Sequence, residues 1–158
     1  MRAYLWDSTL GLGLLLLLLL ASGAQAQRDP PSDLELRTAY CISVLGGRST
    51  DARTRSSLPG PRSQQEALRE EHAGYERDLR RLRAYLLPRT KYLDAAALLA
   101  ATDRGQADVA AFLQAQQACK ARCDSRPSPS GDAAAAAACV EACAAREPAA
   151  ERVGACKQ

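Results

Sequence analysis

The sequence is poor in aromatic residues and lacks asparagine altogether. Its 158 residues include one tryptophan, one phenylalanine, five tyrosines and a single histidine. Without asparagine, no N-x-S/T glycosylation site exists. A strong excess of charge is also missing, because 21 Lys and Arg are set against 18 Asp and Glu, for a formal net charge of +3. Nucleic-acid-binding domains carry a clustered basic face, so we expect no binding of nucleic acid.

The sequence motifs of several common enzyme classes are absent as well. It contains no G-x-S-x-G turn for a serine nucleophile, no Gly-rich phosphate-binding loop and no H-E-x-x-H zinc motif. A histidine base or ligand would have to be His72, which lies at a position expected to pack in a helical core. The sequence therefore predicts a protein that is not an enzyme and holds no cofactor.

The first 26 residues have the pattern of a secretory leader. Arg2 precedes residues 10–21, which are mostly leucine, and Ala24-Gln25-Ala26 offers the small residues that signal peptidase accepts. The apolar run is shorter than the roughly 20 residues that a membrane-spanning helix needs. The pattern predicts a cleaved signal peptide, residues 1–26, and no transmembrane anchor. The mature protein is then exported to the periplasm or the extracellular space.

Residues 27–158 are predicted to form a single helical domain. Ser32 and Glu35 form the S-x-x-E capping box of a first helix, which we expect to end before the Gly46-Gly47 pair. Residues 46–62 contain mostly Gly, Ser, Thr, Arg and Pro, with hardly any large apolar side chain. This composition is typical of a flexible linker.

A second helix is expected from the capping box at Ser63 and Glu66 to the proline at position 88. Its core-type residues are spaced alternately four and three apart, as in a heptad seam. The seam consists of Leu68, His72, Tyr75, Leu79, Leu82 and Leu86. Three heptads are short for a free coiled coil, so we expect the seam to pack within the monomer, with a partner helix or a dimer as the alternative. Glu76 and Arg80 are spaced for an ion pair.

After Pro88 the pattern predicts a third helix, an interruption near Asp103-Arg104-Gly105, and a fourth helix. A loop over residues 124–132 separates the fourth helix from an Ala-rich one, which Asp132 is placed to cap. The expected fold class is all-α: a small helical bundle that ends in a helical hairpin.

Six cysteines follow the leader, and in an oxidising compartment they favour three disulfides. Residues i and i+4 of a helix have Cβ atoms about 5–6 Å apart, farther than the roughly 3.5–4.5 Å of a disulfide. Cys119 therefore cannot bridge Cys123, nor Cys139 bridge Cys143, and the pairs must join the two arms of the hairpin. The predicted bridges are Cys123–Cys139, Cys119–Cys143 and, for the remaining pair, Cys41–Cys156.

The twin C-x-x-x-C hairpin, Cys119 to Cys143, resembles the helical-hairpin proteins of the mitochondrial intermembrane space, in which nested disulfides join two helices. This resemblance implies an architecture and no activity, and the Leu-rich leader argues against mitochondrial import. The Ala39-Tyr40-Cys41 segment is similar to that of small exported proteobacterial proteins.

The four hairpin cysteines also suit a second chemistry. Thiolates on facing helices can surround one Cu(I) or Zn(II) ion, and the arrangement of Cys119, Cys123, Cys139 and Cys143 is similar to that of exported bacterial copper-storage bundles, which are richer in cysteine. An oxidising compartment favours disulfides instead. We therefore expect a non-enzymatic binding or structural protein with an unassigned protein partner, and keep a thiolate metal carrier as the alternative.

Overall fold

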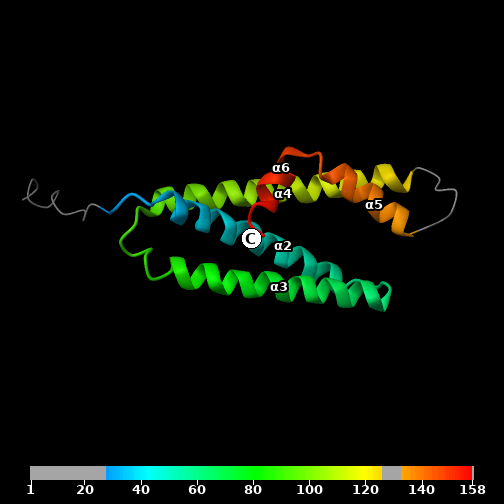
Figure 1. Ribbon diagram of the computed structural model, residues 1–158, viewed down its shortest axis with the longest axis horizontal. Coiled ribbons are helices and arrows are strands. Elements are labelled where there is room, and N and C mark those ends of the chain that lie inside the picture. Colours follow the sequence, from blue (N-terminus) through cyan, green and yellow to red (C-terminus); the bar gives the residue numbers. More distant parts are fainter. Residues whose placement is uncertain (1–27, 126–132, 158) are drawn as a thin grey trace, which may run out of the picture.

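The computed structural model describes residues 28–125 and 133–157. In this part of the chain there are five α-helices and no β-strand (Figure 1): α2 (Asp33–Ser56), α3 (Arg62–Leu86), α4 (Ala95–Asp124), α5 (Ala133–Ala144) and α6 (Pro148–Gly154). Within the described residues, no helix combines the length and the apolar character needed to cross a bilayer. The all-α class with a C-terminal disulfide-clamped hairpin is confirmed. The predicted signal peptide and the capping residue Asp132 lie outside the described residues.

Helix α2 is the central element, because it packs against both α3 and α4 (Figure 1). One apolar cluster joins Leu45 of α2 to Tyr75 and Leu79 of α3 and to Phe112 of α4. A second cluster joins Ala39 of α2 to Leu86 at the end of α3, Leu93 in the connection that follows, and Leu98 and Ala101 near the start of α4. Burial of these side chains supplies the main favourable free energy of folding.

The helix ends agree only in part with the predicted caps. At the start of α2, the Ser32 hydroxyl accepts from the Glu35 backbone N–H at 3.3 Å, and a Glu35 carboxylate oxygen accepts from the Ser32 N–H at 2.9 Å. This capping box was predicted and is confirmed. The predicted box at Ser63 was wrong: α3 begins at Arg62, with Pro61 in the capping position and no side-chain cap.

The predicted break at Gly46-Gly47 does not occur, because α2 continues to Ser56. The interpretation of residues 46–62 as a flexible linker was therefore wrong for residues 46–56, and the connection between α2 and α3 spans only residues 57–61. The reason is close packing between helices. A Cβ atom on Gly47 would lie 2.7 Å from a methyl carbon of Val109, so the glycine lets α4 approach the backbone of α2.

The predicted interruption near Gly105 is also absent, since α4 runs unbroken from Ala95 to Asp124. Gly105 is buried where α4 crosses α2. A Cβ atom there would lie 2.6 Å from the carbonyl oxygen of Tyr40 and 3.0 Å from Cβ of Ser43. This glycine marks a helix crossing, not a loop.

The Gly105→Ala substitution is expected to destabilise the protein by about 2 kcal/mol, because the added methyl group meets backbone that cannot move without separating the two helices. Gly46→Ala is the matched control: a Cβ atom at Gly46 meets nothing within 4 Å, so the better helix propensity of alanine should stabilise the protein by about 0.5–1 kcal/mol. Urea unfolding of both variants measures the difference. Equal stabilities for the two would contradict the described crossing.

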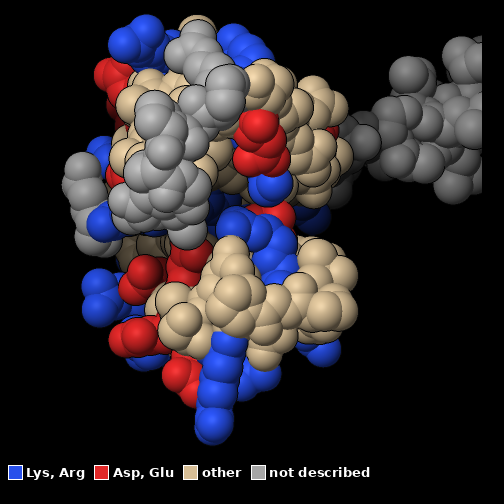
Figure 2. All heavy atoms as spheres, turned by 90° about the vertical axis from the view of Figure 1, so that its right-hand side faces the viewer, with Lys and Arg blue, Asp and Glu red and all other residues tan. Residues whose placement is uncertain are grey.

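The C-terminal helices attach to the bundle mainly through α4. Helices α5 and α6 both pack on α4, and α6 places Ala149 and Val153 in the apolar cluster around Leu45. Figure 2 shows the end of the molecule where α2 and α3 meet, with basic and acidic side chains interspersed over the surface. This face does not present charge of a single sign.

Candidate functional site

Three disulfide bonds join distant parts of the chain, and their pairs are the ones expected from the sequence. Cys119–Cys143 and Cys123–Cys139 link α4 to α5, with Cα–Cα distances of 5.8 and 6.1 Å. Cys41–Cys156 links α2 to the chain just beyond α6, with a Cα–Cα distance of 5.4 Å. All three distances lie within the range of unstrained bridges.

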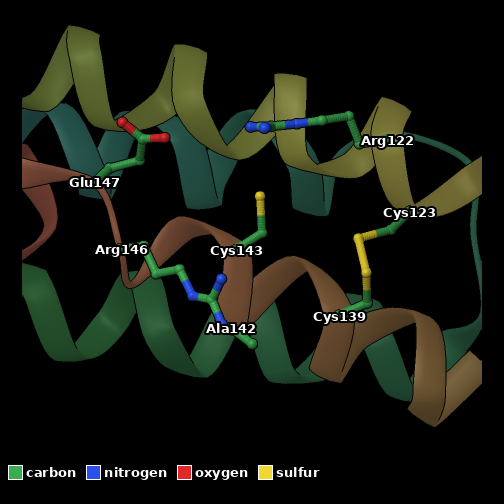
Figure 3. A pocket seen from close by; sticks show the side chains of 7 residues that line it. All are labelled: Arg122, Cys123, Cys139, Ala142, Cys143, Arg146 and Glu147. Carbon is green, nitrogen blue, oxygen red and sulfur yellow. A yellow bond between two sulfur atoms is a disulfide. The ribbon is translucent and has the colours of Figure 1, made fainter.

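A shallow cavity of about 360 Å³ lies beside the hairpin disulfides. Its lining includes Cys123, Cys139 and Cys143, and the side chains of Arg122 and Arg146 flank the sulfur atoms (Figure 3). The Arg122 Nη2 atom lies 3.5 Å from Sγ of the buried Cys119. The cavity is therefore lined by disulfide sulfur, two cationic side chains and the carboxylate side chain of Glu147.

The alternative of a thiolate metal site requires free sulfur, and the structure provides none at these positions. Cys119, Cys123, Cys139 and Cys143 are all in disulfide bonds. Among the described residues, no group of three or more His, Cys, Asp or Glu side chains is arranged to hold a metal ion. A disulfide sulfur lacks the thiolate charge that binds Cu(I) or Zn(II).

The heptad seam of α3 faces the chain's own core. Four of its six positions are buried: Leu68, Tyr75, Leu79 and Leu86. Leu82 is partly buried against the same cluster, and α3 packs on α2. The seam is thus occupied by α2 within the monomer, and a dimer through it remains a prediction that would require α2 to move.

His72, the half-buried polar residue of the seam, belongs to a polar cluster between α2 and α3. The Ser49 Oγ atom lies 2.8 Å from His72 Nδ1 and 2.7 Å from Glu76 Oε1. A carboxylate only accepts hydrogen bonds, so Ser49 donates its one proton to Glu76 and accepts from the Nδ1–H of His72. The hydrogen bond from Ser49 lowers the pKa of Glu76 and outweighs the opposing effect of burial, and the nearby Arg83 lowers it further.

This cluster combines the residue types of a serine hydrolase, but its geometry differs from one. Ser49 is buried and its hydroxyl proton is directed to Glu76, not to the histidine. It also lies inside α2, where backbone N–H groups bond to carbonyls four residues earlier and cannot stabilise an oxyanion. The arrangement therefore ties two helices together and orients the His72 ring.

The Ser49 cluster forms part of the wall of a polar pocket of about 450 Å³ between α2, α3 and α4. Besides His72 and Glu76, the pocket is lined by Arg53 from α2 and Arg83 from α3, whose side chains are exposed. Gly46 also lines the pocket, and no atom lies within 4 Å of the position that a Cβ atom at Gly46 would occupy. In this pocket the side chain of His72, the single histidine of the chain, lies near the exposed side chains of Arg53 and Arg83.

A second polar cluster connects α2, α3 and α4 on the other side of the seam. Arg48 pairs with Glu71 at 3.2 Å and its guanidinium lies 4.7 Å from the centre of the Phe112 ring. The Tyr75 hydroxyl donates to Glu71 at 2.6 Å. Burial and this hydrogen bond raise the pKa of Tyr75 to about 12. Burial opposes ionisation of Glu71, but the hydrogen bond from Tyr75 and the charge of Arg48 outweigh it and lower its pKa.

A third polar cluster fixes α6 to α4. Arg152 donates two hydrogen bonds to Asp108, at 2.6 and 2.9 Å, and Tyr40 donates a third at 2.9 Å. The hydrogen bond from Arg152 lowers the pKa of Asp108, against the opposing effect of burial, and the bond from Tyr40 lowers it further. Burial, followed by the bond to Asp108, raises the pKa of Tyr40 to about 12.

These lowered carboxylate pKa values make stability depend on pH. A carboxylate whose pKa is lower in the folded than in the unfolded chain contributes stability above its ordinary pKa, and this contribution is lost as pH falls through the folded value. We expect the free energy of unfolding to decrease as the pH is lowered below about 4.5.

The Asp108→Asn variant isolates one of these carboxylates. Its loss of stability relative to the unmodified protein should be clear in urea unfolding at pH 6 and should shrink at pH 3, below the ordinary pKa of aspartate, because the unfolded chain binds the proton there and the charge of Asp108 contributes less to stability. A loss of equal size at both pH values would show that the charge of Asp108 is not what stabilises the contact.

The sequence singled out His72 but missed Ser49 and Arg53, which belong to the segment interpreted as a linker. Glu76 was expected to pair with Arg80, whereas it accepts a hydrogen bond from Ser49. The only available signal was the polar residue His72 in an otherwise apolar seam, which indicates a polar partner on the facing helix. Finding that partner requires the register between α2 and α3.

No protein-family model matches this chain, and no curated protein or solved structure matches it either. Its candidate sites are therefore defined by the geometry and chemistry of its own residues.

Proposed function

We propose that this protein is an exported, disulfide-stabilised helical module that binds a partner or ligand and catalyses no reaction. The observation that carries the proposal is that all six cysteines are paired, over sequence separations of 16, 24 and 115 residues. Such bridges form and persist in oxidising compartments outside the cytoplasm. The sequence of residues 1–26, with its basic start, leucine run and Ala-Gln-Ala end, supports the same compartment.

The composition of the core gives a reason for the disulfides. The apolar clusters contain several alanines and only one phenylalanine, Phe112. Alanine buries little area, and apolar burial contributes roughly 25 cal/mol per Å². Bridges worth about 2–4 kcal/mol each then supply a large part of a net stability that is about 5–15 kcal/mol for ordinary domains. Rigid small modules of this kind are suited to presenting a binding surface.

The proposal of a non-catalytic role is supported by the geometry of the Ser49 cluster, which carries the residue types of a serine hydrolase. Ser49 is buried within a helix and directs its proton to Glu76, as described above. If the cluster were catalytic, a Ser49→Ala variant would lose hydrolytic activity toward ester substrates. We expect no such activity in either protein.

Expression in a bacterial host, with and without residues 1–26, tests the proposal. The full chain should be recovered from the periplasm as a protein beginning at Gln27, with an intact mass six hydrogen atoms below that of its reduced form. The chain without the leader should remain in the cytoplasm. Retention of the full chain inside the cell, or free thiols in the exported protein, would contradict the proposal.

A further inference from the structure

We propose that the polar pocket between α2, α3 and α4 binds a small ligand through an anionic group, a phosphate or a carboxylate. Three helices converge there: α2 contributes Ser49 and Arg53, α3 contributes His72, Glu76 and Arg83, and α4 contributes Thr102 and Gln106. The pocket volume of about 450 Å³ suits a small metabolite. This inference names a ligand class for the binding role proposed above and rests on it.

The charges of the lining favour an anion. Arg53 and Arg83 carry two positive charges, and neither makes an ion pair within the described part of the chain. The single carboxylate of the lining, Glu76, accepts a hydrogen bond from Ser49 and keeps its charge, so the two arginines exceed it by one positive charge. Arginine presents a planar set of N–H donors that matches the oxygen atoms of a carboxylate or phosphate. Two such side chains at one opening therefore form a site for an anionic group.

Two threonine hydroxyls and His72 Nδ1 are already committed, whereas the buried Ser43 hydroxyl of the lining has no hydrogen-bond partner; the arginines remain the principal charged donors. The Thr102 hydroxyl donates to the Leu98 carbonyl and the Thr50 hydroxyl to the Gly46 carbonyl, both at 3.0 Å. His72 is held by Ser49 through Nδ1. The ring is thus fixed in the wall of the pocket by a bond that does not involve its second nitrogen, Nε2.

Gly46 keeps the pocket open. It lies inside α2, where glycine costs about 1 kcal/mol of helix stability relative to alanine. A Cβ atom at this position would meet no other atom within 4 Å, so helix packing does not require a glycine there. Gly47 next to it differs, because it allows the close approach of Val109. A side chain at position 46 would instead occupy space that borders the pocket.

The test is a titration of the oxidised full-length mature protein with inorganic phosphate and, separately, with succinate, monitored by ¹H–¹⁵N chemical shifts. We expect saturable binding of at least one anion, with the largest shifts at Ser49, Arg53, His72 and Arg83. Binding of phosphate alone or of succinate alone identifies which of the two groups the site prefers. Saturation by neither anion would overturn the inference.

Two variants separate a specific site from general attraction to a basic protein. The double substitution Arg53→Gln and Arg83→Gln should weaken binding at least tenfold. The matched control, Arg77→Gln with Arg104→Gln, removes the same charge from exposed positions outside the pocket and should leave the affinity unchanged. Equal losses in both pairs would overturn the inference. Gly46→Leu, which leaves every polar group in place, should also abolish binding.

The outcome also distinguishes this inference from the proposed function. An exported, fully bridged protein that binds neither anion would refute the pocket assignment and leave the export and disulfide chemistry intact. A protein that is not exported, yet binds phosphate through Arg53 and Arg83, would refute the proposed export and support the pocket assignment.

Discussion

Replacing Cys41 and Cys156 together by alanine is expected to lower the free energy of unfolding by about 4–5 kcal/mol, the largest effect of any single bridge. The two cysteines are 115 residues apart, so the bridge removes more chain entropy from the unfolded state than either of the others. Both residues are buried in the cluster around Leu45, so the bridge also holds the end of the chain against α2. Urea unfolding followed by circular dichroism at low temperature measures the loss.

The comparison that makes this result informative is the double substitution of Cys123 and Cys139, whose bridge closes a separation of only 16 residues. The same chain-entropy argument gives about 3 kcal/mol for that pair. If removal of the short bridge costs more than removal of the long one, chain entropy is not the main source of stabilisation. The variant without Cys41 and Cys156 need not be fully folded for this comparison, since complete unfolding is itself a loss larger than that of the control.

Removing both hairpin bridges, by alanine at Cys119, Cys123, Cys139 and Cys143, is expected to release α5 from α4. None of residues 135–143 is buried, and an isolated helix of 12 residues is marginal in water even when rich in alanine. Amide hydrogen exchange in α5 should therefore accelerate more than about 100-fold. Protection in α2 and α3, which pack on each other, should persist.

Variants that lack only one hairpin bridge serve as controls for this result. With either Cys119–Cys143 or Cys123–Cys139 retained, α5 stays tethered to α4 and should keep part of its protection. Unchanged exchange in α5 after loss of all four cysteines would mean that packing, not sulfur chemistry, holds the hairpin together.

The hairpin was predictable because its constraints are local. Two cysteines four residues apart on each arm cannot bridge within their own helix, and antiparallel arms then leave one nested pairing. The cap of α2 at Ser32 was predictable for a similar reason, since a capping box is complete within four residues.

Helix α2 beyond Gly46 was not predictable, because it is covered on two sides. A helix that packs against one surface shows a single apolar stripe, but α2 places Ser49 and Ala52 among its buried residues along with Val44 and Leu45. A helix segment that crosses another helix closely is rich in small residues such as Gly and Ser, and loops are rich in the same residue types. The polar pocket was hidden by this error, because Ser49 and Arg53 could be placed beside His72 only once residues 46–56 were known to be helical.

The most direct test of the account is the disulfide map of the purified, non-reduced protein. Digestion without reduction, with trypsin and a glutamate-specific protease, cleaves after Arg122 and Glu141 and so separates Cys119 and Cys143 from the peptide that holds Cys123 and Cys139. The account predicts two species in mass spectrometry: the Cys119 peptide linked to the Cys143 peptide, and a peptide of residues 123–141 with an internal bridge. A single species that joins all three peptides, or free thiols at these positions, would contradict it.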